Sequence, residues 1–421
     1  MSVFDRDNWY EIWASLDKNR VRTALTAFGV FWGIFMLMLL LGSGRGLENG
    51  TQAGFAGSAT NSFYVWTRST TKAYRGLPPG RRFELNNGDV EAVRREVPEA
   101  GVIAPRNQLG GFSRGNNVSR GTRAGGFTVM GDYPEIRRIQ NVRIDQGRFL
   151  NPLDLEEGRK VAVIGTRVQE LLFDAGEEPI GDFVRINGVY FKVIGVFSPT
   201  SRGNQALRDA ETIYIPFTTF QRPFNVGDEV GWFAITSQPG ISASLVEEKV
   251  LELLAQRHRV HPEDRRAFGH WNTEEEFRQL QGLFGGIRVL IWIVGVGTLT
   301  AGVIGVSNIM LIVVKERTRE IGLRRAIGAT PVSIITQILL ESVALTALSG
   351  YLGLLAGVVL VEGSRIAMQS AGISADMFQN PGVSFSNALQ ALAILIICGA
   401  LAGLIPARRA VAISPVEALH A

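Results

Sequence analysis

The sequence predicts an α-helical membrane protein with four transmembrane helices and a large α+β domain outside the membrane. Of 421 residues, 46% are hydrophobic and only 19% charged, with a mean hydropathy of +0.13. This composition is too apolar for an ordinary soluble protein and too polar for one buried wholly in lipid. Four long apolar runs occur, and residues 42–282, between the first and the second, contain no such run. The chain therefore combines a membrane part with one large soluble domain.

The clearest apolar run is Val289 to Val314, whose 26 residues carry no charge. A helix of that length can cross a hydrocarbon core about 30 Å thick. We predict spans at 25–41, within 283–314, at 334–361 and at 388–405, with glycine pairs four residues apart in the last two spans marking close helix packing. Residues 1–24 form an amphipathic helix, 362–387 a short loop and 406–421 a tail.

The distribution of basic residues predicts the orientation. Lys and Arg number 4 before the first span, 5 in 315–333 and 2 after the fourth, against 1 in 362–387. Short loops rich in Lys and Arg stay on the cytoplasmic side. We therefore expect both termini and residues 315–333 to be cytoplasmic, and residues 42–282 to lie on the other side.

For the large domain, the sequence predicts two strand–helix–strand units with a β-rich subdomain inserted between them. The first unit is predicted at residues 61–66, 87–97 and 101–104, and the second at 232–235, 245–256 and 267–270. The inserted strands are predicted at 161–164, 182–186, 189–196 and 212–215, with Asn187 and Gly188 as a hairpin turn. Residues 273–283 extend the second span as a helical stalk.

The cytoplasmic loop 315–333 mixes charged residues with apolar ones, such as Ile321, Leu323 and Ile327. A helix of this composition has an apolar centre with a charged rim, as expected of a docking surface. The alternative is a basic loop that only sets the topology and contacts lipid head groups.

Glu341 lies about eight residues into the third span, roughly 12 Å at 1.5 Å per residue. An acid at that depth is a candidate for function. The alternative is a structural role, in which Glu341 pairs with Arg20, Arg22 or backbone groups.

Other classes of site find little support. His258, His261 and Asp264 lie close in sequence, with His270 nearby, but their segment is polar and we expect solvated histidines and no metal site. The single cysteine, Cys398, excludes an intrachain disulfide and a cysteine-based zinc site. A net charge of +4 is too small to indicate nucleic-acid binding. No catalytic Ser/His/Asp set is evident, so we expect no enzyme.

Several motifs resemble the MacB-like group of ABC-transporter permeases over nearly the whole chain. The segment from Arg319 to Ala329, followed by Pro331 and Glu341, resembles the FtsX-type permease signature. Residues 147–149, 161–165, 179–181, 185–188 and 193–196 resemble the periplasmic core of that group, and 405–410 with 415–419 resemble its tail.

The resemblance implies a multi-pass protein of the bacterial inner membrane that works with an ABC ATPase. The sequence contains no Gly-x-x-x-x-Gly-Lys-Ser/Thr phosphate loop, so we expect no cofactor in this chain and ATP bound by a separate ATPase subunit. It also implies a homodimer, or a heterodimer with a related permease. A periplasmic adaptor and an outer-membrane channel stay open as further partners.

The leading hypothesis is a permease subunit that converts ATP binding and hydrolysis by that ATPase into motion of the periplasmic domain, driving export of a periplasmic substrate. The residues expected to couple to the ATPase are Glu316, Arg319, Glu320, Ile321, Gly322, Leu323, Arg325 and Gly328. The alternative is a signal transmitter that activates a periplasmic enzyme, as FtsX-like proteins do, although the size of the outer domain favours export.

Overall fold

The structure is a computed structural model that describes residues 20–55, 57–110, 115–201, 203–371 and 378–412. Most of the amphipathic helix predicted at 1–24 therefore lies outside the described residues. The chain divides into two compact units, residues 1–50 with 283–421 and residues 51–282. We call them the membrane unit and the outer unit and describe each separately.

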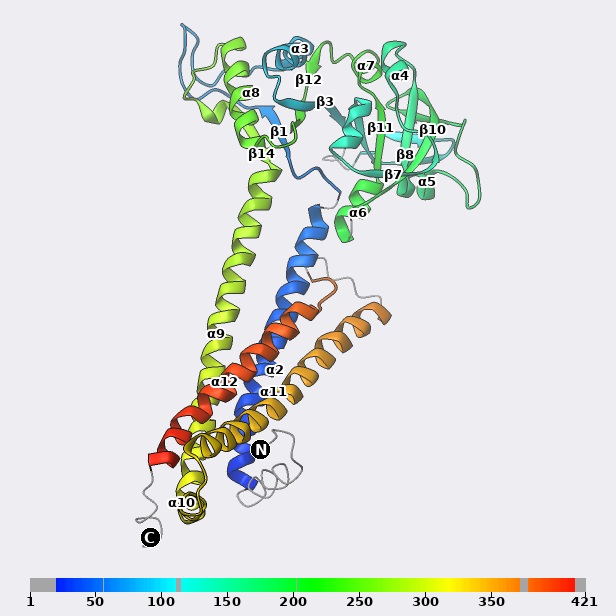
Figure 1. The fold of residues 1–421 in the computed structure, drawn as a ribbon. Coiled ribbons are helices and arrows are strands. Elements are labelled where there is room, and N and C mark those ends of the chain that lie inside the picture. The colour runs from blue at the N-terminus through cyan, green and yellow to red at the C-terminus, as the bar shows by residue number, and fades with distance from the viewer. Residues whose placement is uncertain (1–19, 56, 111–114, 202, 372–377, 413–421) are drawn as a thin grey trace. The chain divides into compact units, whose positions relative to one another are not determined.

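Four long helices supply the predicted spans, and each is apolar enough to cross a membrane. They are α2 (Arg20–Phe55), α9 (Thr273–Glu316), α11 (Pro331–Ser370) and α12 (Phe385–Ala412) (Figure 1). Each extends beyond its predicted span at both ends. The helix predicted at 273–283 is continuous with the second span, as expected.

Within the membrane unit, α9 packs against α2 and α11 packs against both α2 and α12. A methyl group at Gly353 would lie 2.4 Å from the carbonyl oxygen of Phe31 in α2, and one at Gly403 would lie 2.2 Å from Oγ of Ser342 in α11. Only glycine permits such close approach. The close packing predicted from the glycine pairs is confirmed.

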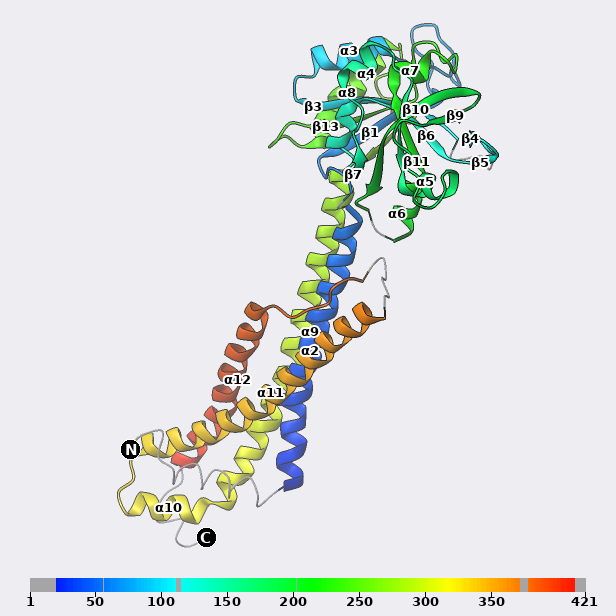
Figure 2. The same ribbon diagram turned by 90° about the vertical axis from the view of Figure 1, so that its right-hand side faces the viewer.

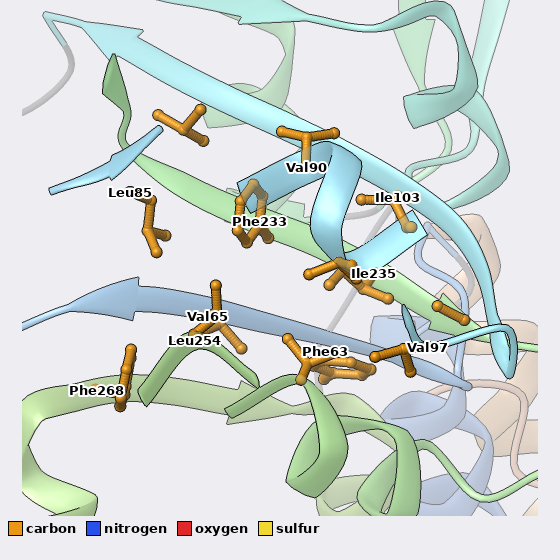
Figure 3. Packing of buried hydrophobic residues seen from close by; sticks show 14 of the residues in the cluster. Phe63, Val65, Leu85, Val90, Val97, Ile103, Phe233, Ile235, Leu254 and Phe268 are labelled. Atoms are coloured by element: carbon orange, nitrogen blue, oxygen red, sulfur yellow. The ribbon is translucent and has the colours of Figure 1, made fainter. Parts of the chain in front are cut away.

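The first core of the outer unit consists of four antiparallel strands, at one end of a twelve-stranded sheet, covered by two helices. Its strands β1 (Ser62–Thr67), β3 (Ala100–Leu109), β13 (Trp232–Ser237) and β14 (Phe268–Asn272) have the order β14-β1-β13-β3. Helices α3 (Asn87–Glu96) and α8 (Ala243–Arg257) follow β1 and β13 in the chain. Figure 3 shows Phe63 and Ile235 of the sheet packed with Val90 and Leu254 of the helices. Both predicted strand–helix–strand units are present.

The second part of the outer unit is β-rich, as predicted. Its longer strands are β6 (Thr128–Asp132), β7 (Val142–Gly147), β8 (Val161–Gly165), β9 (Phe183–Ile186), β10 (Val189–Pro199) and β11 (Thr212–Pro216). Its short strands and helices are β4 (Val118–Arg120), β5 (Arg123–Gly125), η1 (Pro134–Arg138), α4 (Pro152–Glu156), α5 (Thr166–Leu172), α6 (Gly203–Ala210) and α7 (Phe217–Gln221). The pair β2 (Leu85–Asn86) with β12 (Glu229–Val230) and the turn η2 (Arg265–Ala267) complete the described elements.

Local sequence accounts for a tight turn and for a helix cap in this unit. Ile186 pairs with Val189 across a two-residue turn in which Asn187 and Gly188 have φ of +42° and +88°, the conformation that an Asn-Gly hairpin favours. The side chain of Asn86 accepts a hydrogen bond from the backbone N–H of Asp89. The side chain of Asp89 accepts one from the backbone N–H of Asn86, and together the two bonds form a capping box.

Strand β3 joins the two parts of the outer unit. Its Ala104 pairs with β13, whereas Asn107 to Leu109 pair with β6. Between these points, Nε and Nη2 of Arg106 donate to the two carboxylate oxygens of Asp132 at 2.7 and 2.9 Å. The two side chains are 3% and 0% exposed. The insertion therefore shares a strand and a buried ion pair with the first core.

Candidate coupling site

The predicted docking segment forms a separate short helix, α10 (Thr318–Ala326), between α9 and α11 (Figure 2). Arg317, with φ −99° and ψ 13°, separates it from α9. Gly328 has φ +105°, a conformation open to glycine but not to most other residues. Thr330 then caps α11 by accepting a hydrogen bond from the backbone of Ser333, and Pro331 occupies the first turn. The sequence after α10 thus ends one helix and begins the next.

The inner side of α10 belongs to the core of the membrane unit. Ile321 is 9% exposed and lies in the same buried cluster as Val314 of α9 and Ile334 and Ile338 of α11. Gly322 is also buried. These two residues hold α10 against its neighbours.

Charged groups connect α10 to the buried acid of the third span. Glu341, 3% exposed, lies with its Oε2 3.5 Å from Nη1 of Arg317. Glu320 is 3.9 Å from Nε of Arg317 and 2.9 Å from Nη2 of Arg324. Nη1 of Arg324 also donates to Oε1 of Gln337 in α11 at 3.0 Å. These side chains line a small pocket that opens to solvent.

A second connection reaches α12. Nη1 of Arg325 donates to the backbone carbonyl of Val411 at 2.8 Å, near the end of that helix. Through Arg317, Arg324 and Arg325, α10 is therefore tied to both of the helices that follow it in the chain.

The outer side of α10 is exposed and mixed in character. Leu323 is 50% exposed and Ile327, just after the helix, 79%. Glu316 and Arg319 are exposed as well. Arg319 makes no ion pair with any residue that the structure describes.

The expected coupling residues therefore separate into three groups. Ile321 and Gly322 face the interior, and Glu320 and Arg325 bind neighbouring residues of the same chain. The exposed group consists of Glu316, Arg319, Leu323 and Gly328. The pairing of Arg317 with Glu341 was not predicted from the sequence. The two residues are 24 positions apart and lie in different helical segments, so no helical spacing relates them. The side chains of Arg20 and Arg22, proposed as alternatives, lie outside the described residues.

The expectation of solvated histidines is wrong for His258. Its side chain is 12% exposed, and Nε2 lies 2.7 Å from Oδ2 of Asp89. Burial alone would raise the pKa of Asp89, but hydrogen bonds from His258 and Arg257 outweigh it and hold that pKa below its usual value. Nδ1 of His270 likewise lies 2.5 Å from Glu247. Sequence proximity could not reveal these partners, because both come from distant helices.

Two family models cover most of the chain. Residues 23–253 match the MacB-like periplasmic core domain, and residues 292–415 match the FtsX-like permease C-terminal model. The protein belongs to the MacB-like permease family. It is therefore a multi-pass membrane protein whose outer unit is the family's periplasmic core domain, as the resemblance implied.

Individual relatives in this family are similar along nearly the whole chain. The pyoverdine export ATP-binding/permease protein PvdT of Pseudomonas entomophila is 28% identical over 97% of this chain and 58% of its own length. The macrolide export ATP-binding/permease protein MacB of Rhodospirillum rubrum is 29% identical over 97% of this chain and 59% of its own length. The chain thus spans about three fifths of each relative.

Among solved structures, the periplasmic region of MacB from Actinobacillus actinomycetemcomitans is similar at 18% identity and a TM-score of 0.43. The match covers 54% of this chain and 95% of that one.

Proposed function

We propose that this chain is the permease subunit of an ATP-driven exporter, in which α10 transmits the motion of an ABC ATPase to the membrane helices. The observation that carries the proposal is the contact between Arg317, at the junction of α9 and α10, and Glu341, buried in α11. Since α9 also begins at Thr273, directly after the last strand of the outer unit, a displacement of α10 acts on a helix that ends at the periplasmic domain.

The proposed ATPase contact is the outer side of α10. Leu323 and Ile327 offer an exposed apolar centre, and Arg319 offers a charge at its rim. Burying the two apolar side chains would contribute roughly 1.5–3 kcal/mol each before ordering costs. Ile321 supports this surface from inside.

The decisive experiment replaces the exposed apolar residues Leu323 and Ile327 and leaves the buried Ile321 unchanged. We expect Leu323→Asp with Ile327→Asp to insert normally and to lose at least about 90% of ATPase co-purification. The matched control is Phe385→Asp, an 84% exposed apolar residue at the start of α12, which should keep the ATPase. Retention of the ATPase by the double variant would place the coupling surface elsewhere.

The proposal also requires α10 to be cytoplasmic. A reporter that is active only in the periplasm should work when inserted after Leu150 and fail after Arg325. Activity at Arg325 would reverse the orientation and remove α10 from the ATPase.

Export of a periplasmic substrate, rather than signalling, is supported by the relatives, since PvdT and MacB are both named as export proteins. At 28–29% identity the relatives support the class of activity and not its substrate. Because the MacB-like permease family generally implies a dimer and an ABC ATPase partner, we further propose that the working assembly is a dimer of this permease with its ATPase. Removing the chain from cells should leave the exported compound in the periplasm, where comparison of periplasmic extracts would identify it.

A further inference from the structure

The pocket beside α10 has an apolar part and a charged part. Met310 and Val313 of α9 and Ile338 of α11 contribute to its apolar lining. Its charged lining consists of Arg317, Glu320, Arg324 and Glu341. An amphipathic lining of this kind suits a ligand that is itself amphipathic. We call this site the α10 pocket.

The α10 pocket lies where the second span ends. Met310 and Val313 belong to the charge-free run Val289 to Val314, and Arg317 follows that run by three residues. Residues 310–317 extend over roughly 10 Å of helix at 1.5 Å per residue. Basic pockets between membrane helices at this level bind lipid head groups. The pocket therefore reaches from the depth of acyl chains to the depth of lipid phosphates.

The guanidinium of Arg317 has unused donors in this pocket. The side chain is 27% exposed, and its contacts with Glu341 and Glu320 are 3.5 and 3.9 Å long. It donates no side-chain hydrogen bond to any residue that the structure describes. A guanidinium carries five N–H donors in a fork that matches two oxygens of a phosphate. Arg317 is thus able to bind a phosphate group.

The two carboxylates of the pocket balance its two arginines. Oε1 of Glu320 lies 2.9 Å from Nη2 of Arg324, whereas Oε2 lies 3.9 Å from Nε of Arg317. A carboxylate has about four acceptor sites, so Glu320 has room for a further donor. Because the formal charges of the pocket cancel, it does not favour a simple anion. A ligand that carries both a phosphate and an ammonium group matches both signs of charge.

We propose that the α10 pocket binds the head group of an ethanolamine phospholipid. Its phosphate accepts hydrogen bonds from Arg317 and Arg324, its ammonium donates to Glu320 and Glu341, and its acyl chains continue over the apolar lining. A two-carbon link separates phosphate from ammonium in this head group. The opposite charges of the pocket lie 2.9–3.9 Å apart, so each end of the head group meets its counter-charge. The lipid joins α9, α10 and α11 where they meet.

Native mass spectrometry of the purified full-length protein in detergent tests the ligand. The protein is titrated with phosphatidylethanolamine, phosphatidylcholine and phosphatidylglycerol of the same acyl chains, and with soluble phosphoethanolamine. Choline has no N–H donor, so we expect phosphatidylethanolamine to bind at least about fivefold more tightly than phosphatidylcholine. Equal binding of phosphatidylcholine or phosphatidylglycerol overturns the assignment of the head group. Equal binding of phosphoethanolamine overturns the assignment of a lipid, because the apolar lining would contribute nothing.

A change of specificity tests the location of the site. Glu320→Gln alters a side chain that is 48% exposed, so folding is retained, and it leaves two arginines against one carboxylate. We expect the ratio of phosphatidylethanolamine to phosphatidylglycerol affinity to fall at least about fivefold.

The matched control is Glu316→Gln, which removes the same charge from an exposed residue at the end of α9 that does not line the pocket. It should keep the wild-type ratio. An unchanged ratio in Glu320→Gln, or an equal change in Glu316→Gln, overturns the site. Neither titration uses the ATPase, so a failure of the coupling proposal leaves both results interpretable.

Discussion

An arginine is paired with a buried carboxylate in each unit of the protein, and two of these pairs, Arg106–Asp132 and Arg317–Glu341, differ in how fully they are buried. In the outer unit, Arg106 and Asp132 form two short hydrogen bonds with both side chains at most 3% exposed. In the membrane unit, Arg317 is 27% exposed and its nearest nitrogen lies 3.5 Å from Glu341, with Glu320 at 3.9 Å. The fully buried pair of Arg106 and Asp132 holds two strands in place. The contact of Arg317 with Glu341 is longer, and Arg317 also lies near Glu320, so Arg317 can exchange partners when a helix moves.

The largest expected effect comes from breaking the fully buried pair of Arg106 and Asp132. Asp132→Asn leaves Arg106 as a buried charge without a counter-ion, which costs about 3–5 kcal/mol. We expect the outer unit to lose that much stability, measured by the urea dependence of protease resistance in the full-length protein. The control is Glu91→Gln, which breaks an exposed pair with Arg94 and should cost less than about 1 kcal/mol. Equal losses of stability in Asp132→Asn and Glu91→Gln would mean that burial does not make the first ion pair more important than the second.

The next effect concerns the pair of Arg317 and Glu341 and appears in activity rather than stability. Glu341→Gln keeps the size of the side chain and removes its charge, so we expect normal expression and folding with at least a tenfold loss of ATP-driven transport. Glu341→Asp should retain part of the activity. Wild-type transport by a well-expressed Glu341→Gln variant would leave only a structural role for this acid.

A double-mutant cycle sharpens the comparison further. If Arg317 and Glu341 act as one contact, Arg317→Gln combined with Glu341→Gln should impair transport no more than either change alone. The measurement is ATP-driven transport at matched expression. Effects that multiply in the double variant would show that the two residues act independently.

The smallest expected effect is the pH dependence of a charged cluster in which Asp89 contacts His258 and Arg257. Because the pKa of Asp89 is lower in the folded protein, its carboxylate stabilises the fold above the usual carboxyl range, and this contribution is lost as the pH falls through the lowered pKa. The stability difference between the wild type and Asp89→Asn should therefore shrink from neutral to acidic pH. A difference that is constant between pH 7 and pH 3 would contradict the titration of Asp89.

Features that depend on neighbouring residues were predicted from the sequence. The four apolar helices, the turn at Asn187 and Gly188 and both strand–helix–strand units are confirmed. Each depends on the length and spacing of hydrophobic residues or on the conformation that local residues favour. The place of α10 between two spans also followed from composition alone.

The partners of charged residues and the direction of individual side chains were decided only by the tertiary structure. The sequence places Ile321 and Leu323 on the same short helix, but only the packing of α9 and α11 buries the first and exposes the second. The pairing of Glu341 with Arg317 and the sharing of β3 between two cores join segments that have no common periodicity. Local patterns specify helices and turns through short-range contacts, whereas these contacts form only when distant elements pack together.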